Sequence, residues 1–278
     1  PVEKVSNIIP YYIKQLNGIV QEREIISLAY ISIDFLLGYN RSDCIIHSDK
    51  DITSEVSDRI KQIIADLKTN KPIQHIIGET EFYELKFKVN EHTLIPRPET
   101  EELVKWILEH EFTSALDIGT GSGCIAIALR KNKSAEISAI DVSESALLVA
   151  KENAKINEVK INFLLQDILK TTTLPKVDVI VSNPPYVLDK EKETMLDNVL
   201  NNEPNLALFV PNNNPLLFYK KIAELAFTSL SKNGLLFFEI NERFGKETVA
   251  MLSSIGFVDI ELKKDINDKD RMVKATKK

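Results

Sequence analysis

The stretch LDIGTGSGCIAIAL, residues 116–129, decides the fold because a glycine-rich turn here joins a short apolar strand to an apolar helix. Glycine lets the backbone turn tightly and approach a ligand closely, and the start of the following helix offers free amide hydrogens. Strands and helices alternate around this stretch. The predicted strands cover residues 115–118, 136–140, 161–165, 177–182, 234–240, 257–262 and 271–276, and the predicted helices cover 99–111, 123–131, 143–157, 215–231 and 245–254.

Strands that alternate with crossover helices indicate a mostly parallel sheet covered on both faces, which is a doubly wound α/β fold. Only the short turn DINDK, residues 265–269, separates the last two strands. Parallel neighbours need a crossover of about a dozen residues, so we expect one of these two strands to run antiparallel.

A different pattern precedes the α/β region. Residues 1–75 read as a small helical domain, with a buried helix over 24–37 and an amphipathic helix that starts near Thr53. In EFYELKFKVN, residues 81–90, apolar and polar side chains alternate with a period of two, which predicts a β-hairpin. We therefore expect a helical substrate-docking domain at 1–75, a hairpin connector at 76–97 and the α/β domain at 98–278.

The composition limits the partners and the compartment. The chain has 278 residues, 44% of them hydrophobic, and a net charge of −6, which does not favour nucleic acid or anionic lipid. It has two cysteines, and no apolar run approaches the roughly 18 residues of a membrane span. The four histidines show no metal-ligand spacing. We expect a cytoplasmic protein with no membrane segment, no direct nucleic-acid contact and no metal.

The glycine loop favours S-adenosylmethionine as cofactor. Its glycines are spaced G-x-G-x-G, whereas nicotinamide dinucleotides use G-x-G-x-x-G to seat a pyrophosphate. Asp141 ends the next strand about 20 residues later, where a carboxylate can accept both ribose hydroxyls. Asp167 is placed to accept from the adenine amino group, and Ile168 to pack on the ring. The predicted cofactor residues in the loop are Gly119, Thr120, Gly121, Ser122 and Gly123. The alternative is a helix start with small packing residues and an Asp that merely forms a turn.

The fourth predicted strand of the α/β region ends in Ser182 and the tetrapeptide Asn183-Pro184-Pro185-Tyr186. Ligands bind outside the carboxyl ends of parallel strands, so this tetrapeptide should lie beside the glycine loop. An amide or exocyclic amine is a poor nucleophile because its lone pair is delocalised. The Asn183 side-chain oxygen and the Pro184 carbonyl can accept both of its N–H hydrogens and direct lone-pair density toward a methyl donor. Tyr186 can stack on the planar target. The alternative is an ordinary turn after a strand.

The chain also resembles the release-factor glutamine methyltransferase family. The resemblance runs from about residue 70 to the end. It is carried in order by QHIIGETEF at 74–82, FKVN at 87–90, LIPRPETEELV at 94–104, LDIGTGSGCIAIAL at 116–129, DVSESAL at 141–147, SNPPYV at 182–187 and EPNLALF at 203–209.

The resemblance implies a seven-stranded methyltransferase sheet and methylation of the side-chain amide nitrogen (N5) of the glutamine in the Gly-Gly-Gln loop of peptide-chain release factors. It implies that S-adenosylmethionine is the methyl donor and S-adenosylhomocysteine the product. The segment from Gly119 to Gly123, Asp141 and the position after Asp167 would hold the cofactor, and Asn183 to Tyr186 would hold the glutamine. It also places Arg97 and Thr100 near the methionine end of the donor, where helix capping explains them equally well.

Other functions share parts of this pattern. An adenine-N6 methyltransferase acting on DNA or RNA would use the same tetrapeptide, and so would an enzyme that methylates a glutamine of a ribosomal protein. A non-catalytic adaptor of translation could keep the cofactor loop alone. The polar segment 188–215 is longer than usual connections and is either a lid or docking loop or a solvated insertion.

Overall fold

The computed structural model describes residues 2–185, 187–188, 202–204 and 208–278. Tyr186 and most of the segment 188–215 lie outside the described residues. The chain divides into two compact units at the junction between Gly78 and Glu79. Among the described helices, none is long and apolar enough to cross a membrane.

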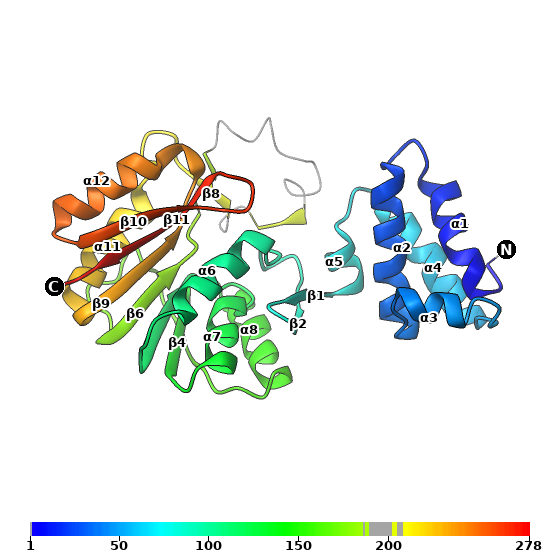
Figure 1. Ribbon diagram of the computed structural model, residues 1–278, viewed down its shortest axis with the longest axis horizontal. Helices are drawn as coiled ribbons and strands as arrows, with labels where there is room; N and C mark the ends of the chain where they lie inside the picture. The colour runs from blue at the N-terminus through cyan, green and yellow to red at the C-terminus, as the bar shows by residue number, and fades with distance from the viewer. Residues whose placement is uncertain (1, 186, 189–201, 205–207) are drawn as a thin grey trace. The chain divides into compact units, whose positions relative to one another are not determined.

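The first unit is a bundle of short helices (Figure 1). The helices are α1 (Val5–Leu16), α2 (Glu22–Leu37), α3 (Arg41–Ile46), α4 (Ser54–Leu67) and α5 (Ile73–Ile77). Thr53 caps α4 by accepting a hydrogen bond from the amide of Val56, as the sequence predicted for a helix that starts there. Pro10 lies inside α1, which is continuous, and Ile8, Tyr12 and Leu16 of this helix are buried in the core.

The second unit begins with a hairpin and continues into a seven-stranded sheet. The hairpin pairs β1 (Glu79–Phe82) with β2 (Leu85–Lys88). The sheet has the order β10-β11-β9-β6-β3-β4-β5. Its strands are β3 (Ser114–Ile118), β4 (Glu136–Asp141), β5 (Asn162–Leu165), β6 (Val177–Ser182), β9 (Leu230–Glu239), β10 (Val258–Lys264) and β11 (Asp270–Thr276). Two further strands, β7 (Val187–Leu188) and β8 (Phe209–Val210), form a separate parallel pair.

The sheet directions match the expectation from connection lengths. β5, β4, β3, β6 and β9 run parallel, whereas β11 is antiparallel to both of its neighbours. β9 begins at Leu230, four residues before the predicted strand. The helix that precedes it ends at Ser229, two residues before the predicted end. Residues 231–234 lie within β9, where its pairing with β6 is irregular, and Asn233 takes a positive φ of 63°.

Helices cover both faces of the sheet (Figure 1). One core cluster joins α6 (Pro98–Leu108), α7 (Cys124–Asn132) and α8 (Glu144–Ile156) to one face. The other joins α11 (Leu217–Ser229) and α12 (Gly245–Ile255) to the opposite face. Alternate residues of a strand enter different clusters, as for Ala115 and Leu116 of β3. This confirms the doubly wound α/β class, with the N-terminal helical region preceding it.

Candidate active site

The glycine-rich loop follows β3 and leads directly into α7. All three of its glycines have positive φ, namely 74° at Gly119, 55° at Gly121 and 84° at Gly123, a region that side chains disfavour. The side chain of Thr120 turns back and donates a 2.7 Å hydrogen bond to Asp117 at the end of β3. A Cβ added at Gly119 or Gly121 would meet no atom within 4 Å, so the backbone here borders open space.

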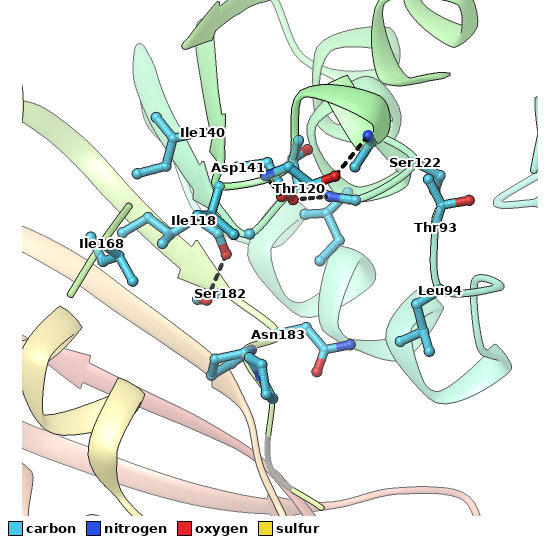
Figure 2. Close-up of a pocket in the computed structure, with 18 of the residues that line it drawn as sticks. Thr93, Leu94, Ile118, Thr120, Ser122, Ile140, Asp141, Ile168, Ser182 and Asn183 are labelled. Carbon is cyan, nitrogen blue, oxygen red and sulfur yellow. Dashed lines mark hydrogen bonds between the residues drawn. The ribbon is translucent and has the colours of Figure 1, made fainter. Parts of the chain in front are cut away.

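Asp141 closes the loop from the neighbouring strand β4. One of its oxygens accepts a 2.9 Å hydrogen bond from the amide of Gly121, and the other accepts one of the same length from the amide of Ser143 (Figure 2). Burial raises the pKa of Asp141 above its ordinary value, and these backbone hydrogen bonds oppose that rise. A carboxylate oxygen has a second lone pair, so both oxygens can still accept a ligand hydroxyl.

The sequence-predicted residues after β5 also lie at this edge of the sheet. Ile168 is buried, and Asp167 accepts a 3.0 Å hydrogen bond from the amide of Leu169, which fixes its carboxylate in a tight turn. Both residues line the same pocket as the glycine loop. The structure therefore brings together the three segments that the sequence singled out for an adenosine ligand.

The tetrapeptide leaves β6, the strand that pairs with β3 on the other side. Ile118 and Ser182 are register partners, and the Ser182 hydroxyl donates a 2.6 Å hydrogen bond to the Ile118 carbonyl (Figure 2). Asn183, Pro184 and Pro185 line the pocket. The side-chain oxygen Oδ1 of Asn183 is buried, and no residue in the described part of the chain donates a hydrogen bond to it. A buried acceptor without a donor is energetically costly.

These segments surround one cavity of about 300 Å³, within the range of small-ligand sites. The sequence predicted that the glycine loop, Asp141, Asp167, Ile168 and the tetrapeptide would form one site. Tyr186 lies outside the described residues, so its predicted role stays a prediction. Further lining comes from residues 92–97, from Thr100 on α6, which the resemblance placed near the donor together with Arg97, and from Ala146 on α8 and Phe218 and Ile222 on α11.

Glu203 is a supporting residue that the sequence analysis missed. Its side chain is 1% exposed. It accepts a 2.7 Å hydrogen bond from the guanidinium of Arg97 and a 3.0 Å hydrogen bond from the amide of Ile95. Ile95 and Arg97 line the cavity, so Glu203 fixes its wall. A lone Glu in a polar connection gave no local signal of burial.

A second buried hydrogen bond joins Thr100, which lines the cavity, to Glu239 on β9. Thr100 donates a 2.7 Å hydrogen bond to Glu239, and both side chains are buried.

Burial also raises the pKa of Asp117 to about 7. Among the described residues, no group of three or more His, Cys, Asp or Glu side chains could hold a metal ion.

The chemistry of the site fits S-adenosylmethionine. The cavity offers carboxylate acceptors at Asp141 and Asp167, an apolar surface at Ile168 and open backbone at Gly119 and Gly121. These groups suit two ribose hydroxyls, an adenine and a small amino-acid tail. Asn183 lines the same cavity, and its buried Oδ1 accepts no hydrogen bond from the described residues.

The chain matches known families in both of its units. Residues 98–208 match the methyltransferase small domain, and residues 14–78 match the PrmC N-terminal domain. A solved methyltransferase structure from Pyrococcus furiosus is similar in fold, with a TM-score of 0.55 and 19% identity, covering 81% of this chain and 99% of that one. Together the fold and the site define an S-adenosylmethionine-dependent methyltransferase.

Curated relatives narrow this class to one family. The release factor glutamine methyltransferase of Flavobacterium psychrophilum is 48% identical, with 98% of both chains covered. The enzyme of the same name from Bacteroides thetaiotaomicron is 40% identical, covering 98% of this chain and all of that one, 100%. The chain belongs to the release factor glutamine methyltransferase family, which confirms the resemblance carried by its motifs.

Proposed function

We propose that this chain methylates the side-chain amide nitrogen of the glutamine in the Gly-Gly-Gln loop of peptide-chain release factors. The relatives at 48% and 40% identity carry that activity in their names, and they are matched over almost the whole chain. The observation that carries the proposal is the buried, unsatisfied Oδ1 of Asn183 in the cavity beside the glycine loop. Release factors act in the cytoplasm, so the proposal also implies that this protein is cytoplasmic.

In this proposal the loop residues, Asp141, Asp167 and Ile168 hold the donor, and the tetrapeptide holds the glutamine. Asn183 Oδ1 and the Pro184 carbonyl accept the two amide hydrogens. The two bonds fix the amide plane and favour lone-pair density on nitrogen. The adjacent prolines restrict the loop, so the acceptors are placed before the substrate arrives. Tyr186 would stack on the amide plane.

The reaction is a displacement at a methyl carbon. When bound, S-adenosylmethionine supplies the methyl group, and its sulfur keeps the electron pair of the broken bond. The new bond forms between the amide nitrogen and that carbon. The nitrogen then loses one hydrogen as a proton to water, so the chain needs no strong base. The contribution of Asn183 and Pro184 is orientation, which brings the reacting atoms to about 3–3.5 Å.

We further propose that the helical unit docks the release factor and that the hairpin of β1 and β2 connects it to the catalytic unit. Two side chains of α3 support this role, because Ile45 is 77% exposed and Ile46 is 72% exposed. On this proposal the two neighbouring apolar side chains form part of the surface that contacts the release factor. Replacing both by serine should raise KM for intact release factor and leave the Kd of the donor unchanged.

The central test is transfer of labelled methyl to three acceptors: release factor, release factor with Gln→Ala in its Gly-Gly-Gln loop, and duplex DNA. We expect label on the first only. Asn183→Ala should bind the donor normally and lose about 10²–10³-fold in turnover. Asn132→Ala at the exposed end of α7 is the matched control and should react normally. Label on DNA would favour an adenine-N6 enzyme, and near-normal turnover of Asn183→Ala would remove the role of its oxygen.

A further inference from the structure

Asn153 links two segments that are distant in the sequence. It lies on α8 and is fully buried. Its side-chain nitrogen donates a 2.9 Å hydrogen bond to the carbonyl of Ser122 in the glycine loop and another to the carbonyl of Lys88 on β2. Its side-chain oxygen accepts a 2.6 Å hydrogen bond from the amide of Lys88. A single amide group therefore holds the loop and the hairpin together.

The same face of α8 also packs closely against the glycine loop. Ala150 lies three residues before Asn153, and positions three apart share a helix face. A Cβ added at Gly123 would lie 3.2 Å from the Cβ of Ala150. α8 therefore fixes the end of the glycine loop both by close packing at Ala150 and by the hydrogen bond from Asn153.

Asn157 provides a natural comparison one turn further along. It follows α8 directly and is also buried, and its side-chain nitrogen donates 2.9 Å hydrogen bonds to the carbonyls of Lys86 and Asn153. It therefore binds the hairpin as well, but neither of its side-chain hydrogen bonds reaches the glycine loop. Loss of Asn157 weakens the hairpin attachment and leaves the bond to Ser122 in place.

We propose that Asn153 is a positioning residue that couples the donor loop to the hairpin, so that donor binding and hairpin order are linked. Ser122 lines the cavity, and Lys88 is not among the described residues that line it. The bond to Ser122 restricts the loop before the donor binds, and the bonds to Lys88 transmit that restriction to β2. Coupling between two sites is reciprocal, so an ordered donor loop also orders the hairpin. The inference rests on S-adenosylmethionine as donor and is independent of the acceptor.

The first test measures donor affinity by calorimetry in Asn153→Ala and Asn157→Ala. Both variants lose buried hydrogen bonds, and both should unfold at lower temperature than the parent chain. Only Asn153→Ala should also bind S-adenosylmethionine more weakly, by about 5- to 100-fold. Asn157→Ala should stay within about twofold of the parent. Equal losses of affinity in the two variants, or no loss in Asn153→Ala, would overturn the proposal.

The second test uses the unaltered chain and so does not depend on a variant that folds. Amide hydrogen exchange is followed at Lys88 with and without S-adenosylmethionine. Ligand binding slows global unfolding everywhere, so the β10–β11 hairpin serves as the internal reference. We expect the donor to slow exchange at Lys88 by a larger factor than at Val273, a register position of that reference hairpin. Equal slowing at both amides would contradict the coupling. No acceptor is present in either test, so neither result depends on the proposed substrate.

Discussion

Replacing Glu203 by alanine should loosen the cavity wall and destabilise the fold by an amount that can be divided between its two partners. The carboxylate is nearly inaccessible, whereas the side chain of Arg97 is 32% exposed. Ile95 contributes a backbone amide, and its hydrogen bond to Glu203 is buried. The two partners therefore differ in how easily water can replace the lost carboxylate.

The magnitude follows from this difference. A buried amide left without an acceptor costs about 1–3 kcal/mol. Arg97 can be rehydrated, so the loss of its ion pair adds only about 0–1 kcal/mol. Glu203→Ala should therefore lower the free energy of unfolding by about 1–4 kcal/mol. Glu203→Gln keeps an oxygen for the Ile95 amide and should lose less than about 1 kcal/mol.

Urea denaturation of the parent chain, both Glu203 variants and Arg97→Ala measures these values directly. We expect the alanine variant to be less stable than the glutamine variant by at least about 1 kcal/mol. Calorimetry should also show weaker donor binding in Glu203→Ala, because Ile95 and Arg97 line the cavity. Equal stabilities of the two Glu203 variants would refute the reasoning, since the ion pair and not the buried amide would then carry the cost.

Three further predictions concern the glycine loop and its surroundings. Burial raises the pKa of Asp117 to about 7. An acid whose pKa is higher in the folded than in the unfolded chain stabilises the fold less as the pH rises. Between pH 4 and pH 8, urea denaturation should therefore show that the free energy of unfolding of the parent falls by about 4 kcal/mol relative to that of Asp117→Asn. In the same denaturation assay, Gly119→Ala should lower the free energy of unfolding by about 1–2 kcal/mol because of the positive φ at this position. Gly123→Ala should lower it by about 1–3 kcal/mol more, because the added Cβ would also contact Ala150. Equal losses in the two variants would contradict this reasoning. Burial raises the pKa of the Cys124 thiol to about 12, so thiol reagents at pH 8 should label it slowly until denaturant is added, and fast labelling of the native chain would count against the structure.

The sheet could be predicted from the sequence because its signals are local. Most strands are short runs rich in apolar residues, and most are separated from the next by a helical pattern or a short turn. The turn DINDK was enough to predict that a terminal strand runs antiparallel, as β11 does. The start of β9 was missed because the polar residues 231–233 interrupt the apolar run of the strand, although the chain continues in the sheet from Leu230 through an irregular pairing.

The candidate site was predictable where parallel strands bring their ends together. Asp141 and Asn183 follow strands that flank β3, so their approach to the glycine loop follows from topology alone. Glu203 and Asn153 could not be found in this way. Each bonds to a segment more than 60 positions away along the chain, and neither stands in a pattern that reports burial. Only the folded chain shows that these polar side chains are internal.

The register between β3 and β6 has a consequence for how such an enzyme could be redirected. Ile118 and Ser182 lie opposite each other, so the loop proposed for the donor and the tetrapeptide proposed for the glutamine leave the sheet side by side. Backbone hydrogen bonds hold neighbouring strands about 4.8 Å apart, independently of any outer segment. The sheet therefore fixes the separation of the two strand ends from which these segments leave. On the proposal that the N-terminal bundle docks the release factor, exchanging it for another binding domain should direct methylation to a glutamine of a different protein and leave the methyl transfer unchanged.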